Sequence, residues 1–216
     1  MTRRRARCGR DDASSDSLAS RASAASIGHL PAMREMTQSD VLELLDLATE
    51  VGVEIWVDGG WAVDAALGEQ TRSHEDLDIL IERKHEAAFA DALRARGFCL
   101  QDRPDTRAWN YVLGDDRGRE VDFHVISRRT DGDWEYGPDG GPPQDVVPAH
   151  ALTGHGLIAG RAVRCLAPEE QVRYHCGYDV DDNDWADVRA LCLRFGIPVP
   201  PDYAKFVDAA SPPTGR

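Results

Sequence analysis

The sequence predicts an α+β fold, because segments with two different apolar periodicities follow one another along its 216 residues. Apolar side chains at every second position over residues 120–125 indicate a half-buried strand. Apolar side chains three and four positions apart, after residue 37 and again over 85–96, indicate amphipathic helices packed on a core. A chain of this length can bury a substantial core.

The first predicted helix begins at Thr37 or Ser39, since either hydroxyl can cap it, and ends before Gly52. Its apolar stripe consists of Val41, Leu44, Leu45 and Ala48. We expect this stripe to face the core.

Residues 54–58 read as a short strand, and a second helix follows over 61–67 until Gly68 ends it. The amphipathic segment 85–96 is the next predicted helix, and it stops at Gly97. A strand, a short helix and a longer helix therefore follow the first helix.

Residues 109–113 and 120–125 are predicted to pair as a hairpin, because residues 114–118 between them read as a turn. Beyond residue 130 the composition changes, and the glycines and prolines of residues 131–148 predict a loop. Trp134 and Tyr136 within it are expected either to anchor the loop on the core or to form a wall over a substrate.

The C-terminal part is predicted to hold one more hairpin and two helices. Residues 157–166 read as a hairpin that turns at Gly160. Pro168 opens the first helix, and the second covers residues 184–195 and is closed by Gly196.

The strongest chemical signal is a pair of aspartates, Asp76 and Asp78. Residues i and i+2 of a strand lie on one side, about 6.6–6.8 Å apart, so these carboxylates can converge on shared divalent cations. Their neighbours are apolar, and two ionised carboxylates in such a setting need a compensating positive charge. The alternative is a solvated strand edge.

Gly59 and Gly60 stand at the start of the second predicted helix. Free backbone amides there point at an anion, and without Cβ atoms a polyphosphate can approach the main chain. A tight turn is the alternative reading. Together with the aspartate pair, however, the glycines suggest chemistry on a nucleoside triphosphate.

Polymerase-like phosphoryl transfer needs a third carboxylate, and the strand over residues 120–125 supplies it. Glu120, Asp122 and His124 share one face of that strand. We favour Asp122, because apolar residues flank it on both sides, and assign Glu120 and His124 supporting roles at most. A merely wet strand face is the alternative.

These residues resemble a known family, the antibiotic nucleotidyltransferases of the aminoglycoside 2''-adenylyltransferase and lincosamide nucleotidyltransferase group, within the polymerase β-type superfamily. The matching motifs are Gly59-Gly60-Trp61 with Asp64, Gln70-Thr71-Arg72 with His74, Asp76-Leu77-Asp78, and Val121-Asp122-Phe123. The similarity covers roughly residues 39–127.

The resemblance implies a minimal nucleotidyltransferase fold like the polymerase β palm, a mixed sheet with flanking helices and a small helical C-terminal region. It also implies magnesium-dependent transfer of a nucleoside monophosphate, AMP from ATP, to a hydroxyl of an aminoglycoside or lincosamide, and hence antibiotic resistance. Asp76, Asp78 and Asp122 would bind the metal, and Asp122 would be the catalytic base.

Arg72 and His74 are expected to add positive contacts to the phosphates that Gly59 and Gly60 cradle. Each has an alternative: Arg72 as a surface ion-pair partner, and His74 as a residue that only orients the strand. Two other functions remain open, a nucleotidyltransferase that modifies a protein as some antitoxins do, and a nucleotide-binding module without turnover.

Charge narrows the class of acceptor. The net charge is −13, and residues 1–36 hold seven arginines against four acidic residues, so residues 37–216 carry −16. Such a surface repels nucleic acid and attracts a small cationic acceptor. Solubility alone is the other explanation of an acidic protein.

We expect three regions: a disordered extension at residues 1–36, a catalytic core at 37–130, and residues 131–216, which shape the acceptor site. No apolar run is long enough to cross a membrane, and no signal peptide is expected. Five scattered cysteines suggest neither a zinc site nor a disulfide framework. A cytoplasmic protein is therefore predicted.

Overall fold

Nine strands and six α-helices make up residues 35–210, the part of the chain that the computed structural model describes. The strands are β1 (Ile55–Val57), β2 (Leu77–Glu82), β3 (Cys99–Gln101), β4 (Asn110–Gly114), β5 (Glu120–Arg128), β6 (Trp134–Tyr136), β7 (Asp145–Val147), β8 (Gly154–Ile158) and β9 (Arg161–Cys165). The helices are α1 (Gln38–Glu50), α2 (Gly59–Leu67), α3 (Arg83–Ala95), α4 (Pro168–Tyr174), α5 (Asp182–Phe195) and α6 (Ala204–Ala210), with 3₁₀ helices at Ala149–Thr153 and Pro201–Tyr203.

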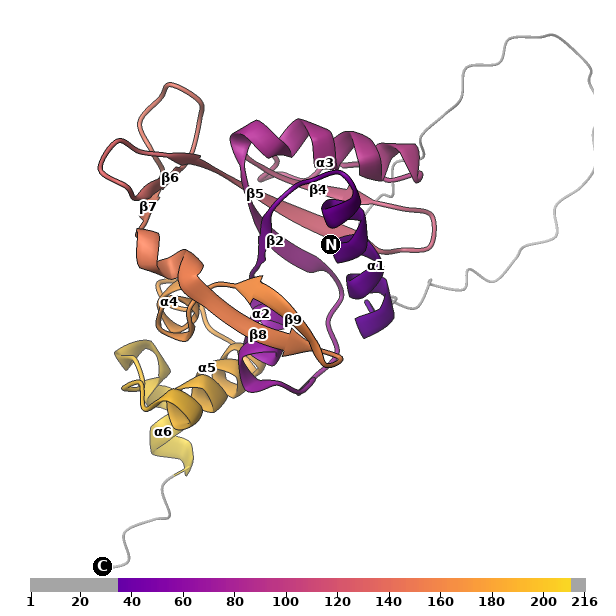
Figure 1. The fold of residues 1–216 in the computed structure, drawn as a ribbon. Coiled ribbons are helices and arrows are strands. Elements are labelled where there is room, and N and C mark those ends of the chain that lie inside the picture. The colour runs from indigo at the N-terminus through magenta and orange to yellow at the C-terminus, as the bar shows by residue number, and fades with distance from the viewer. Residues whose placement is uncertain (1–34, 211–216) are drawn as a thin grey trace, which may run out of the picture.

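All nine strands belong to one mixed sheet, so the predicted α+β class is confirmed. Seven strands lie in the order β3-β4-β5-β2-β1-β9-β8, and the β6–β7 hairpin continues from the end of β5. The pairs β2/β5 and β1/β9 are parallel, and the others are antiparallel. Strands far apart in the sequence, such as β1 and β9, therefore lie side by side in the sheet (Figure 1).

Local signals set the start of α1 and the C-terminal ends of α2 and α5 as predicted, whereas α2 begins at Gly59 and α5 at Asp182, two residues before their predicted starts. The Thr37 hydroxyl accepts a hydrogen bond from the Asp40 amide at 3.2 Å, and the Asp40 carboxylate accepts one from the Thr37 amide at 3.1 Å. This reciprocal cap selects Thr37 over Ser39 as the start of α1. Gly68 and Gly196 end α2 and α5 with φ values of 83° and 70°, which a glycine adopts without strain.

The segment 131–148 differs from its prediction as a loop, because it contains the hairpin of β6 and β7. Each strand has three residues, too few for an alternating pattern to stand out among glycines and prolines. Trp134 of β6 packs edge-on against Trp56, with ring centroids 5.9 Å apart, so this side chain is a core anchor. Tyr136 has a different position, described below.

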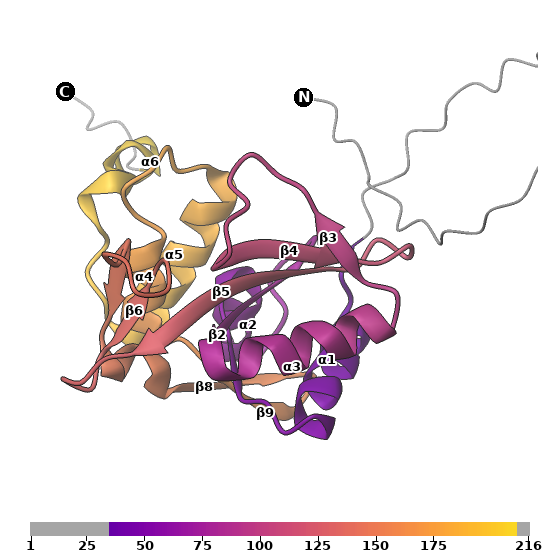
Figure 2. The same ribbon diagram turned by 90° about the horizontal axis from the view of Figure 1, so that it is seen from above.

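Helices α1 and α3 cover one face of the central strands (Figure 2). Ile79, Ile81 and Phe123 point into this layer, where Phe89 of α3 lies 5.8 Å from Phe123 between ring centroids. Because side chains alternate along a strand, Asp78 and His124 point to the opposite face. That face is free of α1 and α3, and it carries the site described below.

Helices α4, α5 and α6 gather at the C-terminal end of the molecule, away from α1 and α3 (Figures 1 and 2). They connect to α2 through a separate apolar cluster, formed by Val63, Val172, Val180, Val188, Leu191, Cys192 and Tyr203. Through this cluster α2 holds the C-terminal helices beside the central strands.

The predicted N-terminal extension, residues 1–36, lies outside the described residues except for Glu35 and Met36. The Met36 side chain is buried, and its amide donates to the His74 carbonyl at 2.7 Å. Among the described helices, none is long and apolar enough to cross a membrane.

Candidate active site

The register of β2 and β5 places two aspartates side by side. Asp78 and Asp122 are direct partners in this parallel pair, and Leu80 and His124 are the next partners on the same face. One ligand atom from each of Asp78, Asp122 and His124 lies within 4.8 Å of the others. Nε2 of His124 is 3.7 Å from Oδ1 of Asp78. We call these three residues the acid cluster.

Asp76 precedes β2, and its carboxyl group interacts electrostatically with Asp78 and Asp122 of the acid cluster. Its pKa is raised to about 7, first by burial and then by the negative charges of Asp78 and Asp122. The three aspartates singled out in the sequence thus interact in one place. Asp76 is not among the three residues whose ligand atoms lie within 4.8 Å of one another.

Asp122 fits the role of a metal ligand. Burial raises its pKa to about 6, aided by the charge of Asp78 and opposed by His124. Its Oδ1 atom is buried and accepts no hydrogen bond from the described part of the protein. A buried carboxylate oxygen without a donor is costly unless a cation meets it, and oxygen ligands suit Mg²⁺. The cluster therefore fits a divalent ion.

The orientation of His124 is fixed by two neighbours. Its Nδ1 atom lies 3.0 Å from Oδ1 of Asn110, and the Tyr136 hydroxyl donates to the same oxygen at 2.7 Å. Burial lowers the pKa of His124, but its contact with Asp78 and the charges of Asp122 and Asp58 outweigh burial and raise it to about 9. Without a bound cation, His124 is the positive charge that faces the carboxylates.

Gly59 is required by the approach of a carboxylate. Its φ is 57°, and a Cβ atom there would lie 2.2 Å from Oδ2 of Asp78. A Cβ atom on Gly60 would lie 2.3 Å from Nδ1 of His74 and 2.5 Å from Nη2 of Arg72. The amide of Gly59 donates to the Asp58 carboxylate at 2.8 Å. The two glycines thus let β2 and the preceding segment lie against the start of α2.

Arg72 and His74 are held by other side chains. Arg72 donates through Nε and Nη2 to the Asp187 carboxylate of α5, at 3.1 and 2.7 Å. Nε2 of the buried His74 pairs with Oδ2 of Asp64. The centroid of the His74 ring lies 4.6 Å from the ring centroid of Trp61. Contact of Arg72 or His74 with phosphate therefore stays a prediction.

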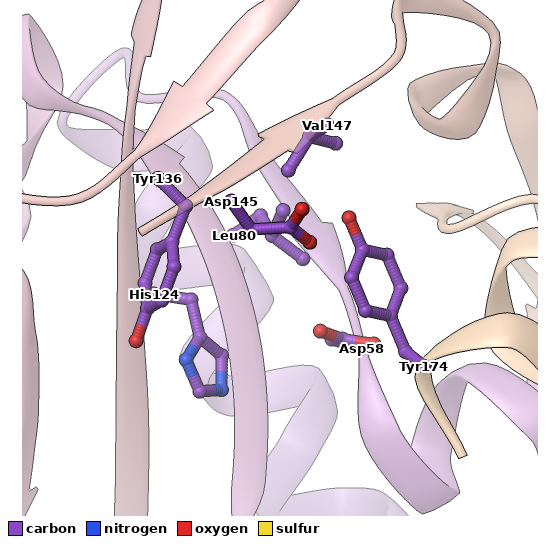
Figure 3. A pocket seen from close by; sticks show the side chains of 7 residues that line it. All are labelled: Asp58, Leu80, His124, Tyr136, Asp145, Val147 and Tyr174. Atoms are coloured by element: carbon purple, nitrogen blue, oxygen red, sulfur yellow. The ribbon is translucent and has the colours of Figure 1, made fainter. Parts of the chain in front are cut away.

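A pocket of about 260 Å³ opens beside the acid cluster. It is lined by Asp58, Leu80, His124, Tyr136, Asp145, Val147 and Tyr174 (Figure 3). Because His124 belongs to both, the pocket leads directly to the acid cluster. The Asp58 and Asp145 carboxylates and the Tyr174 ring lie across the pocket from His124 and Tyr136.

Asp58 was missed in the sequence, which placed it at the end of the strand over residues 54–58, whereas in the structure it is the N-cap of α2. Burial raises its pKa, Asp78 adds to the shift, and His124 opposes it. Gln171 of α4 donates to its Oδ1 at 3.0 Å. Asp145 and Tyr174 were not singled out individually, although residues 131–216 were expected to shape the acceptor site, because only the fold brings their segments to β5.

Comparison with known proteins places the chain in a family. The family model described as aminoglycoside-2''-adenylyltransferase matches residues 40–191. A lincosamide resistance protein from Staphylococcus haemolyticus is 28% identical over 162 residues, which cover 72% of this chain and 94% of that protein. A 2''-aminoglycoside nucleotidyltransferase from Klebsiella pneumoniae is 28% identical over 167 residues, 71% of this chain and 85% of that protein.

Solved structures agree. The lincomycin-bound lincosamide antibiotic adenylyltransferase LnuA has a TM-score of 0.64 and 26% identity, covering 73% of this chain and 98% of its own. ANT(2'')-Ia in complex with adenylyl-2''-tobramycin has a TM-score of 0.56 and 20% identity, covering 81% and 98%, and supports the fold alone. With a polymerase β-like fold and a family match over most of its length, this chain belongs to the aminoglycoside-2''-adenylyltransferase family of antibiotic nucleotidyltransferases.

Proposed function

We propose that this protein transfers AMP from ATP to a hydroxyl group of a small cationic antibiotic, of the aminoglycoside or lincosamide type, with Mg²⁺ as the metal. The observation that carries the proposal is that the acid cluster adjoins, through His124, a pocket lined by two further aspartates, Asp58 and Asp145. The family and the names of the relatives point to the same chemistry. Because ATP is the co-substrate, we expect the reaction in the cytoplasm.

Asp76, Asp78 and Asp122 would hold the metal. The unpartnered Oδ1 of Asp122 and the raised pKa of Asp76 both reflect negative charge that a divalent cation would neutralise. A bound Mg²⁺ would neutralise charge on the triphosphate and on the leaving pyrophosphate.

Asp122 is also our candidate for the base. It would take the proton of the acceptor hydroxyl as that oxygen bonds to the α-phosphorus and the bond to the β-phosphate oxygen breaks, releasing pyrophosphate. A pKa near 6 leaves this carboxylate mostly ionised at neutral pH and more basic than an ordinary aspartate.

The phosphates would lie at the start of α2. Gly59 and Gly60 let Asp78, His74 and Arg72 lie against this helix start, which supports a triphosphate bound beside those side chains. Arg72 and His74 stand within the same group of contacts, next to the position where a Gly60 Cβ atom would be. We therefore include in the proposal that the side chains of Arg72 and His74 contribute positive charge to the binding of the phosphates.

The pocket suits a cationic acceptor. Asp58 and Asp145 supply negative charge, and Leu80 and Val147 supply apolar surface for the carbon skeleton. A protonated amine attracted by the carboxylates would bring a neighbouring hydroxyl toward Asp122.

The direct test is product formation. The purified protein is incubated with Mg²⁺, each of the four nucleoside triphosphates and a panel of aminoglycosides and lincosamides, and products are detected by mass. The expected product is one antibiotic plus one adenosine monophosphate. Asp78→Asn should give none, whereas Asp116→Asn, which changes an exposed turn, should behave as wild type. Absence of a nucleotide adduct on every acceptor would contradict the proposal.

A further inference from the structure

We propose that Nε2 of His124 is a metal ligand together with Asp78 and Asp122, that Asn110 and Tyr136 position its ring, and that this nitrogen raises the affinity of the site for transition ions such as Co²⁺ far more than its affinity for Mg²⁺. The inference rests on the proposed function in one respect, that the site takes a divalent metal. It goes further because it adds a nitrogen ligand, Nε2 of His124, to a site for which the sequence predicted only carboxylate ligands.

Distances permit the assignment. Two atoms bound to one ion at about 2.0–2.2 Å each can be at most about 4.4 Å apart. Nε2 of His124 and Oδ1 of Asp78 are 3.7 Å apart, within this limit and beyond hydrogen-bonding distance. Oδ1 of Asp122 lacks a donor in the described part of the protein. The ligand atoms of all three residues lie within 4.8 Å of one another, so a small inward shift of the side chains would let one cation bind all three.

The hydrogen bonds determine which ring nitrogen is available. Oδ1 of Asn110 is a carbonyl oxygen and only accepts, so Nδ1 of His124 must carry a proton and donate. Nε2 is then the nitrogen that faces Asp78, and a bound ion replaces the proton on it. A metal-ligating histidine ordinarily donates its other nitrogen to such an oxygen.

Tyr136 secures this arrangement. Its hydroxyl donates to the same Oδ1 of Asn110 at 2.7 Å, so this one oxygen accepts from both Tyr136 and Nδ1 of His124. Tyr136 also lines the pocket, so the hairpin of β6 and β7 connects the pocket wall to the acid cluster. Asn110 and Tyr136 are positioning residues, because they act through the ring of His124.

An imidazole ligand changes the relative affinity of the site for different divalent ions. Oxygen ligands suit Mg²⁺, whereas imidazole adds affinity for transition ions such as Co²⁺ and Ni²⁺. A His124 ligand should therefore raise Co²⁺ affinity strongly and Mg²⁺ affinity only slightly.

The test measures metal binding to the full-length protein without nucleotide or acceptor. Co²⁺ is titrated by its visible absorption and Mg²⁺ by calorimetry. His124→Gln should weaken Co²⁺ binding at least about 10-fold and Mg²⁺ binding by less than about 3-fold. His155→Gln is the matched control, because His155 is exposed on β8, and it should leave both affinities unchanged.

Variants of Asn110 test whether this residue positions the His124 ring. They also replace His124→Gln as the test of the inference if that variant fails to fold. Asn110→Leu keeps every ligand atom but removes the acceptor for Nδ1, so Co²⁺ affinity should fall about 10-fold. Asn110→Asp keeps an acceptor oxygen and should bind Co²⁺ at least as tightly as wild type. Tyr136→Phe should have a smaller effect than Asn110→Leu. Circular dichroism confirms the fold of each variant.

Two results would overturn the inference. The first is an unchanged Co²⁺ affinity and absorption in folded His124→Gln. The second is an equal loss of Co²⁺ and Mg²⁺ affinity in that variant, which would mean that the His124 ring acts through charge or packing. If His124→Gln is unfolded, equal Co²⁺ affinity of Asn110→Leu and Asn110→Asp overturns it. Failure of the adduct assay with these metal results intact would refute the proposed function and leave the His124 assignment standing.

Discussion

Asp78 and Asp122 are direct register partners of parallel strands, although α3, β3 and β4 lie between them in the sequence. Parallel pairing puts both carboxylates on one face, and Phe123 and Ile79, their neighbours along the strands, on the other. The same strand register therefore places the apolar side chains in the core under α3 and brings the carboxylates together in the acid cluster. A shift of one residue would bury the charges and expose the apolar side chains.

Asp76→Asn should stabilise the metal-free protein at neutral pH. The folded pKa of Asp76 is about 7 and the ordinary value is about 3.9, so ionisation of this group opposes folding. Wild type should lose stability relative to the variant as pH rises from about 4 to 7, reaching a deficit of up to about 4 kcal/mol, since each pKa unit is worth about 1.4 kcal/mol. Urea unfolding with chelator at pH 4 and pH 8 measures the difference.

The control for this experiment is Asp116→Asn in the exposed turn between β4 and β5, which should track wild type at both pH values. A difference between Asp76→Asn and wild type that does not grow with pH would show that burial and the neighbouring carboxylates do not raise the pKa of Asp76.

Gly59→Ala should abolish turnover, because its Cβ atom would displace the Asp78 carboxylate 2.2 Å away. Gly52→Ala is a matched control: its φ is 69°, but no atom lies within 4 Å of its added Cβ. Both variants should lose about 1 kcal/mol of stability from the left-handed backbone. Only Gly59→Ala should also lose at least about 10²-fold in turnover, by a steady-state assay. Equal turnover in the two variants would refute the role of this contact.

Arg72→Gln separates two roles of one side chain. Its pair with Asp187 predicts that Arg72→Gln and Asp187→Asn each lower the melting temperature and that their effects are not additive. If Arg72 also contacts the triphosphate, as we propose, Arg72→Gln should raise the Kd of ATP by at least about 10-fold more than Asp187→Asn. Equal ATP affinity in the two variants would assign Arg72 to the ion pair alone.

Local signals predicted α1 to α5 and several of the strands because their causes are local, but they predicted neither β3 nor α6. The cap at Thr37 and the left-handed glycines 68 and 196 depend on a few neighbouring residues. The hairpin of β6 and β7 escaped prediction, since three-residue strands show no periodicity and Trp134 is fixed by Trp56, far away in the sequence.

The three aspartates could be predicted as a group because each stands out against apolar neighbours. Their partners could not. Asp145 and Tyr174 reach the pocket only through the packing of β7 and α4 beside β5, and Asn110 acts on His124 through the register of β4 and β5. Such relations depend on long-range pairing, which a single sequence does not display.

The final prediction distinguishes Asp122 from its neighbours on the same strand face. Asp122→Asn keeps size and shape but loses charge and basicity, so the chemical step should slow by about 10²–10⁴. ATP affinity should fall far less than turnover, because Asp76 and Asp78 remain. Glu120 already accepts a hydrogen bond from Arg103 at 2.5 Å, so Glu120→Gln should cost much less. Single-turnover rates at saturating Mg²⁺ measure these effects.

His124→Gln completes the comparison and should also cost less than Asp122→Asn at saturating Mg²⁺, since imidazole adds little to Mg²⁺ binding. The decisive contrast is between the two carboxyl variants on β5, which share one face. If Glu120→Gln nearly abolishes the chemical step while Asp122→Asn leaves it near normal, Glu120 is the base and the assignment of Asp122 is wrong. If both variants slow the chemical step to the same degree, both carboxylates are needed for it, and the assignment of the base to Asp122 alone is wrong.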